Sequence, residues 1–243
     1  LGKGVTVSAA AEVSKDSLRG SLSLTDPDYN FTGKELSYYL KNIKNDKTDS
    51  GYENSIFGAG IGLSYEKFKD VYFSPGISLT YDDLTTDETA STLLQNQSGS
   101  ATDLMLDYSL STDKRDRRFM PTNGYLTSFF QEFPIYADQP FIKNSFSSSH
   151  YNEFSENVVG ALKFSVTSIN GLNDEDVRVS QRLTLSTKKL RGFQAGKIGP
   201  KDGSDFVGGN YSSSLNLEAN FPNFFPEKSN AEVGLFLDAG NVW

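Results

Sequence analysis

The side chains that most often carry catalysis are nearly absent from this sequence. It has one histidine, His150, and no cysteine. A serine-hydrolase triad needs a histidine beside an activated serine, yet no Gly-x-Ser-x-Gly turn accompanies His150. Because it lies in the serine-rich run 147–151, we interpret His150 as a solvated strand residue. Thiolate and paired-histidine metal sites have no ligands here. The sequence predicts a non-enzymatic protein without a metal site or another cofactor.

Two acidic runs are candidates for calcium. They are Asp82-Asp83 and Asp174-Glu175-Asp176, and carboxylate oxygens are the ligands that calcium prefers. Both runs lie in or next to polar loops, where acidic side chains are more often simply hydrated. We therefore favour hydrated carboxylates over a calcium site.

The most informative chemistry lies in a glycine-rich segment at 190–210. It begins Leu190-Arg191-Gly192-Phe193, and five further glycines follow. Glycine permits tight reversals and positive φ, so such a loop can fold back on itself. A guanidinium can pair with two carboxylates, and a charge-assisted hydrogen bond in a partly enclosed site contributes about 1.5–3 kcal/mol. Arg191 is thus a candidate anchor for the loop; the alternative is an exposed arginine without a partner.

The elements that would position this loop are β-strands. Apolar and polar residues alternate with a period of two, which is the pattern of a half-buried strand. The alternation is weakest at 124–134 and 144–154. About eleven segments show it, near 4–14, 16–26, 33–43, 53–65, 71–82, 101–112, 124–134, 144–154, 157–168, 211–221 and 231–238.

One face of these strands is apolar, and the other is small, polar or charged. A soluble β-sandwich would instead pair an apolar core face with an outer face rich in lysine and glutamate. A face of glycine, serine and threonine suits a water-filled lumen, with the apolar face in lipid. The same alternation places Glu218 and Asp238 inside, where Arg191 could bridge them. The pattern predicts an all-β fold, an antiparallel transmembrane β-barrel.

Composition agrees with this interpretation. The net charge of −8 and the pI near 4.8 disfavour a nucleic-acid partner, because phosphate binding needs a clustered basic surface. No run approaches 18 apolar residues, and the mean hydropathy is −0.44, as expected when only every second strand residue meets lipid. Residues 1–4 lack the features of a signal peptide, so we expect an internal fragment of a longer protein. The whole range 1–243 is interpreted as one domain.

The alternative to a transmembrane barrel is a soluble β-sandwich or a β-solenoid adhesin, although no fixed repeat supports a solenoid.

The predicted connections differ between the two ends of the barrel. Short turns at one end and longer loops at the other are typical of outer-membrane barrels, with 14–16 as a short exception at the long-loop end. The short set is 27–32, 66–70, 113–123, 155–156 and 222–230, and the longer set is 44–52, 83–100, 135–143 and about 169–210.

At these motifs the chain resembles the BamA family. Leu190-Arg191-Gly192-Phe193 is similar to that family's (Val/Leu)-Arg-Gly-Phe motif, and 198–200 with 208–210 match the rest of its loop. The run 236–243, Phe-Leu-Asp-Ala-Gly-Asn-Val-Trp, is similar to its Asp-x-Gly-x-Val-Trp strand. A further set resembles its periplasmic turn signature: Asp113, Arg115, Asp116, Pro121 and Gly124.

This resemblance implies a barrel of about sixteen strands, of which the eleven segments look like strands three to thirteen. It implies that the loop at about 169–210 dips into the lumen, with Arg191 held by Glu218 and Asp238. The implied location is the outer membrane of a Gram-negative bacterium. The implied function is folding and insertion of outer-membrane proteins through a seam between the first and last strands. Its implied partners are unfolded client proteins, accessory assembly lipoproteins and outer-membrane lipid.

Since both seam strands would be missing, we expect the fragment to be inactive alone. Two alternative functions remain. A sister-family exporter, of the TamA or two-partner-secretion type, shares the loop motif. A passive porin or adhesin barrel would share only the strand pattern.

Overall fold

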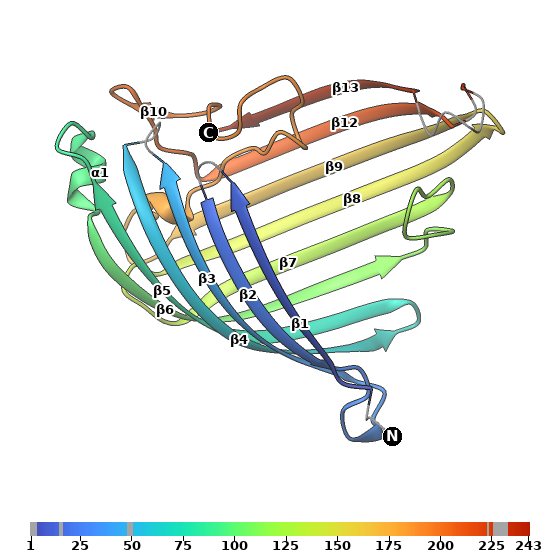
Figure 1. The fold of residues 1–243 in the computed structure, drawn as a ribbon, viewed down its shortest axis with the longest axis horizontal. Helices are drawn as coiled ribbons and strands as arrows, with labels where there is room; N and C mark the ends of the chain where they lie inside the picture. Colours follow the sequence, from blue (N-terminus) through green and yellow to red (C-terminus); the bar gives the residue numbers. More distant parts are fainter. Residues whose placement is uncertain (1–3, 15–16, 48–50, 223, 226–232) are drawn as a thin grey trace.

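The protein folds into one curved antiparallel sheet. The computed structural model describes residues 4–14, 17–47, 51–222, 224–225 and 233–243. Among these, eleven strands form a sheet that curls into a deep, open trough, a partial β-barrel with β1 and β13 at its edges (Figure 1). The strands are β1 (Thr6–Ser14), β2 (Ser17–Asp26), β3 (Glu35–Lys47), β4 (Tyr52–Phe68), β5 (Val71–Thr86), β6 (Gly99–Asp113), β7 (Gly124–Ala137), β8 (Phe141–Ser155), β9 (Val158–Gly171), β12 (Tyr211–Phe221) and β13 (Val233–Val242).

The predicted all-β antiparallel fold is confirmed. The two weakest predictions, 124–134 and 144–154, are β7 and β8. Each strand from β1 to β9 pairs with the next along the chain, and β12 pairs with β9 across the long segment 172–210. That segment holds two short strands, β10 (Lys201–Asp202) and β11 (Asp205–Phe206), and the 3₁₀ turn η3 (Val179–Gln181). No helix in the described ranges combines the length and apolar character needed to span a membrane.

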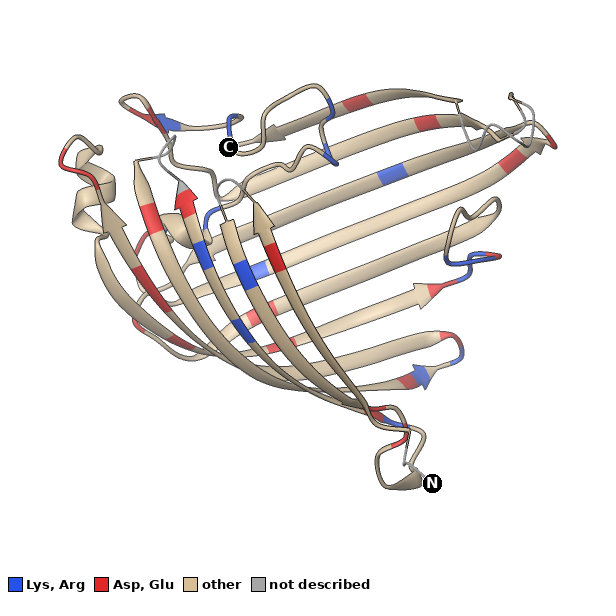
Figure 2. Cartoon of the chain, viewed as in Figure 1, with Lys and Arg blue, Asp and Glu red and all other residues tan. Residues whose placement is uncertain are grey.

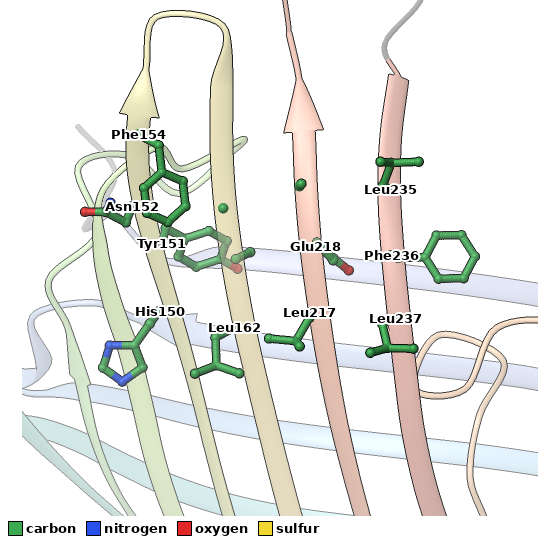
Figure 3. Close-up of a pocket in the computed structure, with 13 residues that line it drawn as sticks. His150, Tyr151, Asn152, Phe154, Leu162, Leu217, Glu218, Leu235, Phe236 and Leu237 are labelled. Carbon is green, nitrogen blue, oxygen red and sulfur yellow. The ribbon is translucent and has the colours of Figure 1, made fainter.

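The outward face of the sheet is apolar, as the alternation predicted. Leu162, Leu217 and Leu237 lie directly opposite one another on β9, β12 and β13 (Figure 3). Leu217 is 43% exposed and Leu237 67% exposed. An exposed apolar surface this continuous is costly in water and favourable in lipid.

The inward face carries small and charged residues. Gly60 lies beneath Tyr39, and Gly76 faces Asp107; a Cβ at Gly60 would meet the Tyr39 ring at 2.5 Å. Charged residues on the strands are few and scattered (Figure 2). Those on the inward face include Asp107, Glu132, Lys163, Glu218 and Asp238. The interior of the trough is therefore polar.

Several strands extend further than predicted. β4 runs to Phe68, and β7 and β8 leave only 138–140 between them, so the loop expected at 135–143 is wrong in extent. The loop expected at 83–100 is likewise shortened, and it contains the helix α1 (Thr92–Asn96). About 9–11 residues are enough to cross the bilayer. At β7 and β8 the extended ends are covered, because Ala137 and Phe141 pack with Val177 of the segment 172–210. The ladder therefore continues there although the apolar alternation disappears.

Some predictions fall outside the described residues. These are the short connection at 15–16, the centre of the loop at 44–52, most of the turn at 222–230, and the first two residues of the strand expected at 231–238.

The buried apolar residues gather where the segment 172–210 meets the sheet. Three clusters are found in the described part of the chain, and each contains residues of this segment. Val179 and Val207 pack with Ala90 and Leu94, while Leu185 and Leu190 pack with Val242. Ordering a loop costs roughly 1–2 kcal/mol of backbone entropy per residue, and this burial offsets part of that cost.

Candidate functional site: an arginine on two inward carboxylates

Arg191 reaches two inward-facing carboxylates. Its Nε and Nη2 donate to the two oxygens of Asp238 at 2.7 and 2.6 Å, and its backbone N–H donates to the same carboxylate at 3.0 Å. Its Nη1 lies 3.1 Å from Glu218 Oε1. A planar guanidinium that meets one carboxylate with two parallel bonds is held in both position and orientation. We call Arg191, Glu218 and Asp238 the arginine lock.

The strand register places the two acids. Asp238 of β13 lies directly opposite Asn216 of β12, and Glu218 is two residues further along β12, on the same inward face. Asn216 donates to Asp238 Oδ1 at 2.7 Å and to the carbonyl of Lys189 at 2.9 Å. Asp238 is only 4% exposed at its side chain. A carboxylate this enclosed is stable as a charge because four donors surround it.

Two further residues complete the lock, and the sequence analysis missed both. The guanidinium of Arg191 lies 3.8 Å above the ring of Phe236, a cation–π contact. Lys163 of β9 bonds to Glu218 Oε2 at 2.6 Å. Phe236 is two residues before Asp238, so strand alternation alone places it on the inward face. Lys163 lies between the outward-facing Leu162 and Phe164, so the same alternation places it on the inward face, opposite Asn216.

The loop around Arg191 has a compact local structure. Leu190 donates its N–H to the carbonyl of Ser186 at 3.1 Å, which closes a turn just before the arginine. Gly192 follows with φ +84°, a conformation that favours glycine. Leu190 is buried against Val242, whereas Phe193 is 57% exposed and does not join the lock. Of the four motif residues, the structure brings Leu190 and Arg191 against the sheet.

The turn between β6 and β7 holds the other predicted motif. Arg115 donates from Nε and Nη2 to the carboxylate of Asp113, both at 2.8 Å. Asp116 accepts the backbone N–H groups of Thr122 and Asn123 at 3.0 and 3.1 Å. Gly124 then starts β7 with φ +97°, and Pro121 lies within the same turn. Asp113, Arg115, Asp116 and Gly124 therefore all shape this connection.

We expect the stability of this turn to depend on pH in acid. The N–H of Asn123, with further bonds from Thr122, lowers the pKa of Asp116 from 3.8 to about 2. Since the folded pKa is lower than the unfolded one, the stabilisation is complete above pH 4 or so and is lost as the pH falls through about 2. Amide hydrogen exchange at Thr122 and Asn123 measures it. A loss of protection centred near pH 4 would contradict this account, and Asp116→Asn serves as the pH-insensitive control.

The remaining candidate residues behave differently from one another. His150 is exposed on β8 and stacks against Tyr125, with ring centroids 5.5 Å apart. The interpretation of the acidic runs as hydrated is wrong for Asp82, which is 1% exposed beside Arg178 of the folded loop. Asp176 pairs with Arg182 at 2.5 Å but is 55% exposed and remains in contact with water. Among the described residues, no group of three or more potential ligands is arranged to hold a metal ion.

The chain is similar to known proteins in sequence and in structure. A family model described as the Omp85 superfamily domain matches residues 1–243. The chain is 28% identical over 211 residues to an outer membrane protein assembly factor BamA of Neorickettsia risticii, covering 85% of this chain and 28% of the relative. It is 25% identical over 212 residues to a SAM50-like protein of Schizosaccharomyces pombe, covering 83% of this chain and 44% of the relative.

The fold is also similar to a solved structure. That structure is a crystal structure of BamA from Haemophilus ducreyi lacking POTRA domains 1–3. The TM-score is 0.87 at 23% identity, and the match covers 100% of this chain and 53% of the other. The chain thus spans about half of that structure and less than half of each of the two sequence relatives.

Proposed function

The chain belongs to the Omp85 superfamily, and from this premise we propose that it is the greater part of the barrel of an outer-membrane protein assembly factor. The observation that supports this most is the docking of Arg191 on Asp238 and Glu218. The relative named as an outer membrane protein assembly factor, at 28% identity, supports the same function. We place the protein in the outer membrane of a Gram-negative bacterium, where the apolar outward face meets lipid.

In this proposal the protein acts by shape and not by chemistry, so it is not an enzyme and needs no cofactor. Its clients are unfolded outer-membrane proteins, and accessory assembly lipoproteins are its expected partners. The curved sheet forms a wall in the membrane, and the arginine lock braces the end of that wall at β12 and β13. With β12 and β13 held by the arginine lock, the sheet keeps its curvature while a client strand pairs elsewhere on the barrel. The lock is thus a structural requirement for insertion.

The function is tested in cells that depend on the intact protein. Depletion is expected to stop other barrels from reaching their folded form, which heat-modifiable gel mobility measures. Arg191→Ala, supplied in place of the native protein, removes the charge-assisted bonds to Asp238 and Glu218, each of which contributes about 1.5–3 kcal/mol. We therefore expect folded clients to decrease several-fold. Lys188→Ala is the matched control, because Lys188 is an exposed cation in the same loop.

Two results would overturn the proposal in favour of the alternatives. An exporter would leave client barrels intact on depletion while one secreted protein accumulated inside the cell. A passive porin would conduct ions through a wide lumen in planar bilayers, with a conductance unaltered in Arg191→Ala.

A further inference from the structure

A second arginine of the same loop is more deeply buried than the first. Arg178 is 6% exposed and Asp82, on β5, is 1% exposed at the side chain, with Arg178 Nε 3.2 Å from Asp82 Oδ2. The arginine lock uses neither residue. By comparison, Arg191 is 30% exposed. A buried ion pair is tolerated only when further hydrogen bonds satisfy both partners.

Both partners of this pair are satisfied. Asn54 of β4 donates to Asp82 Oδ1 at 2.9 Å, and the hydroxyl of Ser180 bonds to Oδ2. Arg178 Nη2 donates to the carbonyl of Gly99, at the start of β6. The pair therefore joins the loop to β4, β5 and β6 at once. None of these contacts involves β12 or β13.

The surroundings of Arg178 are also anchored. The N–H of Val179 donates to Gln97 Oε1 at 2.7 Å, and Val179 packs with Leu94 of α1, which is fully buried. Further along the loop, Asp205 accepts the N–H of Ser91 at 3.0 Å. The connection between β5 and β6 thus covers the loop from one side, and the strands cover it from the other.

The two arginines hold the loop to distant parts of the sheet. Arg191 follows Arg178 by thirteen positions, yet β6, β7, β8, β9 and β12 separate their partner strands β5 and β13. The loop therefore crosses the trough from one wall to the other, near the end that carries α1 (Figure 1).

We propose that Arg178 and Asp82 form a second anchor, independent of the arginine lock, which fixes the first half of the loop to β5 and makes the loop a strap held at both walls. Arg178 is a positioning residue for that strap. The inference concerns how the loop is held and does not depend on which clients are served. Its failure is therefore distinguishable from failure of the proposed assembly function.

The test uses two buried reporters in the intact protein, with other cysteines removed. This chain has none of its own. Val179→Cys reports on the Arg178 end and Leu185→Cys on the Arg191 end; both native side chains are 3% exposed. Labelling by a membrane-impermeant maleimide measures how often each end opens. Arg178→Met leaves the buried carboxylate of Asp82 without its ion-pair partner. We therefore expect it to speed labelling of Val179→Cys by at least about tenfold.

Independence predicts a reciprocal pattern. Arg178→Met should leave labelling of Leu185→Cys within about twofold, and Arg191→Ala should speed Leu185→Cys while leaving Val179→Cys unchanged. Equal responses of both reporters to either variant would show one cooperative loop and overturn the proposal. So would labelling of Val179→Cys that Arg178→Met leaves unchanged.

A paired variant shows whether Asp82 is the partner. A buried ion pair replaced by apolar residues of similar size often keeps its stability. Arg178→Met with Asp82→Leu should therefore restore slow labelling of Val179→Cys, although each single variant speeds it. Each single variant speeds labelling of Val179→Cys by some factor. If the double variant speeds it by the product of those two factors, the residues are not coupled and the anchor is not this pair.

Discussion

Asp238→Asn lowers the free energy of unfolding of the intact barrel by about 2–3 kcal/mol. The carboxylate accepts three hydrogen bonds from Arg191 and one from Asn216, in a site where its side chain is 4% exposed. An amide of the same shape has no charge, and its NH₂ group meets donors instead of acceptors. Urea unfolding of the barrel in lipid vesicles, followed by gel mobility, measures the loss.

The matched control is Asp174→Asn in the same loop. Asp174 is exposed, and its φ of +60° is a conformation that asparagine also adopts readily. Its expected effect is within about 0.5 kcal/mol. Equal midpoints for Asp238→Asn and Asp174→Asn would mean that the lock contributes nothing to stability.

Gly124→Ala destabilises the barrel by about 3 kcal/mol. Gly124 has φ +97°, and a Cβ there would lie 2.1 Å from the carbonyl oxygen of Lys114. That contact is with backbone, so no side-chain rotation relieves it. Lys114 also donates its N–H to the carbonyl of Tyr125 at 2.7 Å, which ties the two strands together at this turn. The added methyl group must therefore open the turn between β6 and β7.

Gly20→Ala is the control for this prediction. Gly20 lies within β2, has no positive φ, and would place its Cβ in open space. It should change stability by less than about 0.5 kcal/mol. The account of the turn is wrong if the two alanine variants unfold at the same urea concentration.

Much of the fold followed from alternation along the strands. A period of two is a local property, so it assigned the inward face of β12 and β13 before any strand was placed in space. That parity placed Glu218 and Asp238 on one face as two carboxylates that Arg191 could bridge, and the family resemblance implied the same pairing. Turn residues such as Gly124 were identified by resemblance and not by their pattern.

What sequence could not predict depends on non-local contacts. Asp82 lies more than 90 positions before Arg178, and no periodicity in the loop 172–210 indicates which wall it touches. Strand ends were also missed, because β4 and β7 continue beyond the residues at which the apolar alternation stops. Phe236 is a different case. Strand alternation already placed Phe236 on the inward face, yet an aromatic residue was not expected in a polar lumen.

The central claim is that Arg191 holds the loop through Asp238. A double-mutant cycle in the intact protein, with Arg191→Ala, Asp238→Ala and the pair, tests it most directly, using the free energy of unfolding in lipid vesicles. We expect a coupling energy of about 1.5–3 kcal/mol, because each single variant already removes the bonds that the other would lose. Strictly additive effects of the two substitutions would contradict the account.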